Sequence, residues 1–135
     1  MDVAKCRALK ARLADQPEPQ VVPIADFFDG NDDLGSIGCN LDPHPGLDAF
    51  RDVLTGLLRR ADVQAVYAQI SELDAGEDMW PFSNTVVVAG EISPDDLRTA
   101  VSSLHPDEVG DAGALVLSSS IAERHGSAVQ VIWWD

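Results

Sequence analysis

The residues of this sequence best suited to chemistry are oxygen-bearing side chains gathered in one short acidic segment. Asp29, Asn31 and Asp33 alternate along it, at the spacing that lets a curled backbone point its ligands at a hard cation such as Ca²⁺. The rest of a calcium loop is missing, because Leu34 stands where glycine is needed and Asn40 stands where a bidentate glutamate is needed. We therefore interpret the segment as a metal-free turn whose carboxylates accept hydrogen bonds from neighbouring backbone N–H groups.

Catalytic motifs are missing from the sequence. It contains no G-x-S-x-G, G-x-G-x-x-G or Walker A pattern, and its three histidines form no paired metal-ligand pattern. No cofactor is predicted. The alternative hypothesis is a small-ligand or metal-dependent enzyme that uses the acidic 26–44 loop, with Asp29, Asp33 and His44 lining a cleft.

Tryptophan is the other informative residue type. Trp80 stands in a Trp-Pro-Phe segment that could form an apolar interaction patch, and tryptophan is enriched at binding hot spots. Trp133 and Trp134 are adjacent in a predicted strand, so their side chains face opposite sides of the sheet. We expect one of the two to be exposed, or to be covered by an added element or a partner chain.

The charge of the chain is strongly negative and unevenly distributed. The net charge is −14, yet Lys5, Arg7, Lys10 and Arg12 supply four of the nine cations, so residues 15–135 alone carry −17. Such a surface repels nucleic-acid phosphates and anionic membranes, because binding either of them needs a basic face. It attracts basic protein surfaces and accelerates encounter with them.

The leading hypothesis is therefore a non-enzymatic, cytoplasmic protein-binding module that presents carboxylates and an exposed tryptophan to a basic partner. An alternative without chemistry is a structural homodimer joined through the terminal strand. The predicted partner-binding residues are acids of two loops together with two tryptophans: Asp29, Asp32, Asp33, Glu77, Asp78, Trp80 and Trp134.

Hydrophobic periodicity predicts the elements that must position these residues. Apolar stripes at helical spacing predict helices over 2–13, 45–60 and 93–104, and β-branched or alternating runs predict strands over 36–41, 63–71, 85–89 and 128–134. This order is the βαββαβ order of a ferredoxin-like α+β fold, with an antiparallel sheet, helices on one face and an extra N-terminal helix. Segment 21–28 could be a short edge strand or an extended approach to the core, and 114–117 could be a further strand.

The chain as a whole predicts a single domain spanning 1–135, with the amphipathic helix of 1–15 packed on it. We expect a soluble protein, since no apolar run approaches the ~20 residues of a membrane helix. The start of the chain has no apolar leader, so the expected location is the cytoplasm. Cys6 and Cys39 fit no metal or redox pattern and are expected to be reduced.

Three segments together resemble a known group of proteins. They are Phe-Phe-Asp-Gly-Asn-Asp-Asp at 27–33, Trp-Pro-Phe-Ser at 80–83 and a closing Trp-Trp-Asp at 133–135. They resemble small, acidic, uncharacterised bacterial proteins of similar length. In composition the chain also resembles immunity proteins of bacterial toxin systems, which implies an inhibitor of a basic toxin or nuclease domain as the specific form of the binding module.

Overall fold

The computed structural model describes residues 2–113 and 115–134, which form a five-stranded antiparallel sheet with helices on both faces. The strands of this part of the chain are β1 (Val21–Pro23), β2 (Val63–Glu72), β3 (Phe82–Gly90), β4 (Glu108–Gly110) and β5 (Val129–Trp133). Its α-helices are α1 (Val3–Ala14), α2 (Ile24–Phe28), α3 (Leu47–Gly56), α4 (Pro94–Val101) and α5 (Ser119–His125). Three short 3₁₀ helices in the same part of the chain are η1 (Leu34–Ser36), η2 (Leu57–Arg59) and η3 (Ser102–Leu104).

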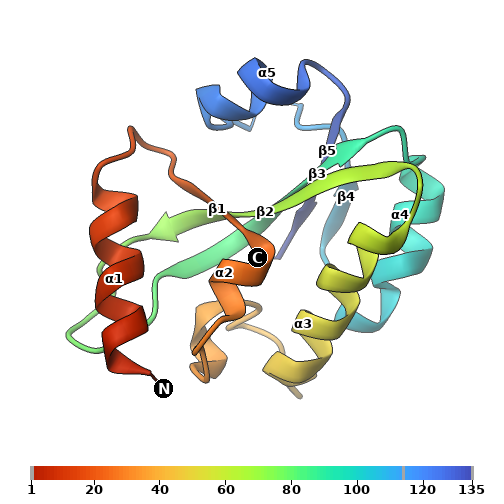
Figure 1. Ribbon diagram of the computed structural model, residues 1–135. Helices are drawn as coiled ribbons and strands as arrows, with labels where there is room; N and C mark the ends of the chain where they lie inside the picture. The colour runs from red at the N-terminus through yellow and green to blue at the C-terminus, as the bar shows by residue number, and fades with distance from the viewer. Residues whose placement is uncertain (1, 114, 135) are drawn as a thin grey trace.

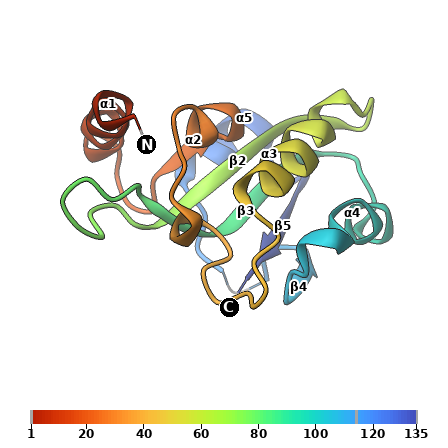
Figure 2. The same ribbon diagram turned by 90° about the horizontal axis from the view of Figure 1, so that it is seen from below.

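Helices cover the two faces of the sheet unequally. Figure 1 shows α5 on one side of the strands and the other helices on the opposite side. Figure 2, seen from below, shows α1, α2, α3 and α4 in one layer across the face opposite α5. The larger part of the core lies between this layer and the sheet, whereas a smaller cluster around Tyr67, Val87 and Val131 lies under Ile121 of α5.

The three predicted helices are confirmed as α1, α3 with η2, and α4 with η3. Side-chain caps explain two of their starts, because Asp2 accepts a hydrogen bond from the backbone N–H of Lys5 and Ser93 accepts one from that of Asp96. The predicted strands at 63–71, 85–89 and 128–134 are confirmed as β2, β3 and β5, and the edge-strand interpretation of segment 21–28 is confirmed for β1. The rest of that segment is helix α2, which begins directly after Pro23.

The predicted strand at 36–41 is wrong. Ile37 makes a single isolated bridge to Ser83, and the chain then turns away through Gly38, whose φ of 63° breaks the extended geometry that a strand needs. Of the possible strand at 114–117, residues 115–117 form no regular structure, and residue 114 lies outside the described residues.

The ferredoxin-like arrangement is not confirmed, although the α+β class and the antiparallel sheet are. The strand order is β1-β2-β3-β5-β4, and α5 covers the face that was expected to be bare. The terminal strand β5 pairs with β3 on one side and β4 on the other. In this sheet β5 therefore has no open edge at which the terminal strand of a second copy could pair.

Side chains close both edges of the sheet. At β1, the amide group of Gln16 donates to the carbonyl of Val21 and accepts from its N–H, at 3.0 and 3.1 Å, in the manner of a neighbouring strand. Pro23 removes a further donor from that edge. At β4, Arg98 donates to the Val109 carbonyl at 3.0 Å. Short and capped edge strands of this kind discourage pairing with another chain.

No helix among residues 2–113 and 115–134 is long and apolar enough to span a bilayer.

Candidate functional site

Two of the acids predicted to bind a partner lie beside α1 and are already paired with its cations. Lys5 Nζ lies 2.7 Å from a carboxylate oxygen of Asp29, and Arg7 Nη2 lies 3.4 Å from one of Asp78. The loop that precedes η1 and the loop that joins β2 to β3 are distant in sequence, yet both reach α1. The structure thus brings together the two acidic segments that the sequence marked separately.

Two further acids complete this arrangement, and the sequence did not single them out. Lys10 lies 3.5 Å from a carboxylate oxygen of Asp74 and also donates to the carbonyl of Gly76, while Arg12 lies 3.3 Å from Asp26. All four cations of α1 are therefore matched by acids of the main body. We call the surface under α1 that carries Asp26, Asp29, Asp74 and Asp78 the α1-docking surface.

Apolar side chains between the two pairs of cations anchor α1 on the main body. Cys6, Leu9 and Leu13 are each 3% exposed or less and belong to the main core. The Cys6 thiol lies 3.5 Å from the carbonyl oxygen of Met79. Burial raises the pKa of this thiol and so disfavours the reactive thiolate of Cys6 while α1 is docked.

The electrostatics of the docked helix are those of a solvent-exposed interface. The hydrogen bond and the charge of Asp29 raise the pKa of Lys5. At least one partner in every pair is about half exposed, so salt screens these contacts, and single contacts of this type contribute little to stability. Together they give α1 a defined position and register on an acidic surface.

Other predicted site residues serve the local fold. Asp33 accepts hydrogen bonds from the backbone N–H groups of Gly35 and Trp80, at 3.0 and 3.3 Å, which confirms the interpretation of this segment as a backbone-bonded turn. Asp32 and Glu77 are exposed at the surface.

The two tryptophans named for partner binding are buried, so the expectation that they are exposed is wrong. Trp80 is 0% and Trp134 is 2% exposed. The Trp134 indole donates to the Leu104 carbonyl at 2.9 Å and packs against Phe50. Trp133, its neighbour, faces the second side of the sheet and is half-buried, as the alternation of a strand requires.

The cleft proposed for an enzyme receives no support from the contacts of its residues. His44 bonds through Nε2 to the Ile37 carbonyl and through Nδ1 to the Gly46 N–H, both at 2.8 Å. Asp29 and Asp33 have the partners given above. Within residues 2–113 and 115–134, no group of three His, Cys, Asp or Glu side chains is placed to hold a metal ion.

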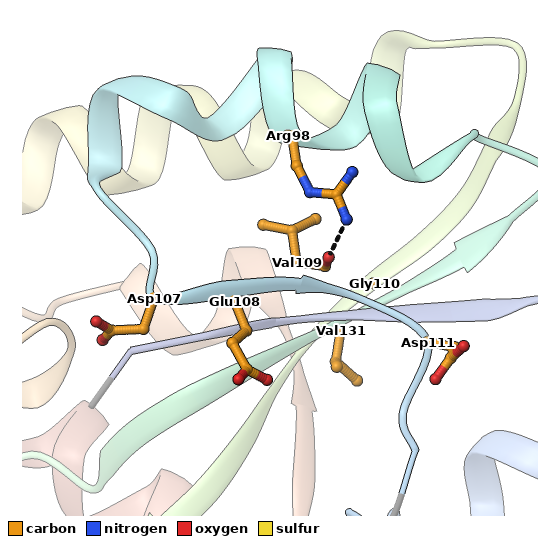
Figure 3. A pocket seen from close by; sticks show the side chains of 7 residues that line it. All are labelled: Arg98, Asp107, Glu108, Val109, Gly110, Asp111 and Val131. Carbon is orange, nitrogen blue, oxygen red and sulfur yellow. Dashed lines mark hydrogen bonds between the residues drawn. The ribbon is translucent and has the colours of Figure 1, made fainter.

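A second acidic surface lies at the other edge of the sheet. It is a hollow of about 470 Å³ against β4, lined by Arg98, Asp107, Glu108, Val109, Gly110, Asp111 and Val131. Figure 3 shows the Glu108 and Val131 side chains on the same side of β4 and β5, with Arg98 reaching the strand from α4. We call this surface the β4 hollow.

The charges of the β4 hollow are not balanced from within. Its one cation, Arg98, is bonded to Asp95 at 2.9 Å and to the Val109 carbonyl. Glu108 and Asp111 are exposed, and no ion pair joins either of them to another described residue. Glu108 is the register partner of Trp133, so a half-buried tryptophan lies directly beside its carboxylate.

Sequence reasoning missed the β4 hollow because β4 is only three residues long. It also missed the pairing of α1 with the body, although a signal was present: four cations within the first twelve residues precede a remainder of charge −17. Opposite blocks of this kind in one chain predict mutual attraction, but charge alone does not say which acids are contacted.

The fold and these surfaces define a small acidic α+β protein with one acidic surface occupied by its own basic helix and another that is open. The chain belongs to the family described as Uncharacterized protein YfbO family, whose model matches residues 4–131. It is similar to the Uncharacterized protein YfbO of Escherichia coli (strain K12), with 28% identity over 123 residues that cover 90% of this chain and 86% of the relative. No solved structure matches the chain.

Proposed function

We propose that this protein is a non-enzymatic binding module that captures a basic protein partner at the β4 hollow. The observation that carries the proposal is the unbalanced charge there: Glu108 and Asp111 have no cationic partner among the described residues, while Arg98 is committed to other contacts. A Lys- or Arg-rich segment supplies the missing charge. Carboxylates beside a basic partner also speed association.

Trp133 supports the same assignment. An interface needs an apolar anchor as well as charge, and tryptophan is one of the residue types enriched at binding hot spots. Its side chain lies on the same face as Glu108 and Val131, so a partner seated in the hollow can cover it. The proposed partner surface thus contains Trp133 in place of Trp80 and Trp134, which were predicted from the sequence and are buried.

The specific form of this proposal is an immunity-type inhibitor of a basic toxin or nuclease domain in the cytoplasm. It is supported by the acidity, the small size and the open acidic surface. It predicts that the protein suppresses the toxic activity of the partner it captures, which an inhibition assay with the purified pair measures.

Affinity capture from an extract of the source organism tests the binding module. The immobilised wild-type chain is compared with Glu108→Gln/Asp111→Asn and with the matched control Glu72→Gln/Glu91→Gln, which removes two exposed charges elsewhere. We expect a basic protein to be retained by the wild type and the control at low salt, and lost from the hollow variant. If every protein retained by the wild type is retained equally by the hollow variant, the proposal is wrong.

A further inference from the structure

We propose that the α1-docking surface is a second binding site, one that takes a basic amphipathic helix of a partner protein, and that α1 occupies it in the free chain. It lies on a different surface from the β4 hollow and does not depend on the function proposed for that hollow. The structure carries this inference because it already contains the complex: a basic helix seated on acids and apolar groups of the main body.

The match between α1 and its surface is specific in both charge and shape. Its cations contact acids of two separate segments, with Asp26 and Asp29 on one side and Asp74 and Asp78 on the other. Between them Cys6, Leu9 and Leu13 form the apolar stripe that enters the core. A competing helix therefore needs apolar residues at i, i+3 and i+7 flanked by lysine or arginine.

Release of α1 removes no strand and no edge contact from the sheet. α1 contributes no strand to the sheet, and Gln16, which closes the edge of β1, lies beyond the end of the helix. The contacts that hold α1 are its ion pairs, three apolar side chains and a few hydrogen bonds to the backbone of the main body. Because α1 is tethered, its effective concentration is in the millimolar range, so a free helix competes poorly until α1 is weakened.

Peptide binding tests the site. The probe is a fluorescent peptide with the sequence of residues 2–15 carrying Cys6→Ser, and its anisotropy is measured with the full chain. Lys5→Glu/Lys10→Glu in the protein repels α1 from Asp29 and Asp74 and leaves the docking surface unchanged. We expect this variant to bind the peptide at least about tenfold more tightly than the wild type, because the tethered competitor is weakened.

Matched variants separate a specific site from general attraction to an acidic protein. Arg59→Glu/Arg124→Glu makes the same change in net charge at exposed positions away from α1, and its affinity for the peptide should equal that of the wild type. Adding Asp29→Asn/Asp74→Asn to the Lys5→Glu/Lys10→Glu protein should remove the gain. An equal gain in the Arg59→Glu/Arg124→Glu control would overturn the proposal.

Displacement of α1 can be followed without changing its charges. In a Cys39→Ser protein, Cys6 is the remaining thiol and is 1% exposed. A maleimide therefore reaches it only after α1 leaves the α1-docking surface. Saturating peptide should accelerate Cys6 labelling several-fold, and Leu9→Ser, which removes an apolar anchor, should lower the peptide concentration needed. If labelling is unchanged by the peptide, or if light scattering shows that the Leu9→Ser chains instead pair with one another and exclude it, the proposal fails.

Discussion

At the scale of single residues, the adjacent tryptophans show how one step along a strand changes the role of a side chain. Trp134 fills the core and satisfies the Leu104 carbonyl, whereas Trp133 is half-buried beside Glu108. Trp134→Phe removes the indole donor and leaves that carbonyl unpaired. We expect it to lower the free energy of unfolding by about 2 kcal/mol, measured by urea denaturation. Trp133→Phe should lower the free energy of unfolding clearly less. Equal losses in the two variants would contradict the assignment of Trp134 as the buried hydrogen-bond donor.

Arg60 and Asp62 form a bidentate pair, in which two guanidinium nitrogens of Arg60 contact the two carboxylate oxygens of Asp62 at 2.9 and 3.0 Å. The hydrogen bonds from Arg60 lower the pKa of Asp62 from its ordinary value of 3.8. The Arg60–Asp62 pair therefore stabilises the fold fully when the pH is above the ordinary pKa of the carboxyl group. This stabilisation is lost as the pH falls through the lower pKa of Asp62 in the folded state.

Arg60→Gln should raise the pKa of Asp62 back toward its ordinary value, since the charged donors are removed. An NMR titration of the Asp62 carboxyl carbon measures this directly. Arg98→Gln, which removes an exposed arginine from α4, serves as the control and should leave the Asp62 titration unchanged. A pKa of Asp62 that stays low in Arg60→Gln would show that another group causes the shift.

At the scale of elements, the sequence was informative where periodicity is long and failed where elements are short. The helix over 45–60 and the strand over 63–71 have enough residues for a pattern to be visible. Segment 36–41 has an alternating pattern too, but Gly38 turns the chain out of strand geometry. Helices α2 and α5 have five and seven residues, too few for a stripe to appear, and tertiary packing of Phe27 and Ile121 supports them.

The edge at β1 gives a prediction at this scale. Gln16 satisfies both backbone groups of Val21, which is itself buried, so Gln16→Ala leaves a donor and an acceptor unpaired. We expect a loss of about 1–3 kcal/mol in the free energy of unfolding, measured by urea denaturation, together with concentration-dependent association as the edge opens. Gln64→Ala, at an exposed position of β2, is the control and should change neither measurement.

At the scale of the whole molecule, net charge was readable from the sequence but its arrangement was not. Acidity and a basic first helix follow from composition. The pairing of Lys10 with Asp74, 64 residues away, depends on how the sheet places the β2–β3 loop beside α1. Asp29 and Asp78 were both predicted to bind a partner, and in the free chain both are paired with cations of α1 itself.

This arrangement predicts that salt acts on the molecule in two opposite directions. Raising the salt concentration from about 20 to about 500 mM shortens the screening length from about 20 Å to about 4 Å. Screening relieves the self-repulsion of a chain with net charge −14, so the urea midpoint of global unfolding should rise. Screening also weakens the exposed pairs that hold α1, so Cys6 of the Cys39→Ser protein should react faster with a neutral maleimide, relative to an unfolded reference peptide.

The same protein with Lys5→Glu and Lys10→Glu provides the decisive comparison. In that variant the contacts of α1 with Asp29 and Asp74 are repulsive and those with Asp26 and Asp78 stay attractive, so salt should accelerate the labelling of Cys6 much less than in the parent protein. A difference of this kind cannot arise from a general effect of salt on the reagent or on the core, because both proteins share those effects. Acceleration of equal size in the two proteins would show that Cys6 is exposed by some motion other than the release of a helix held by charge.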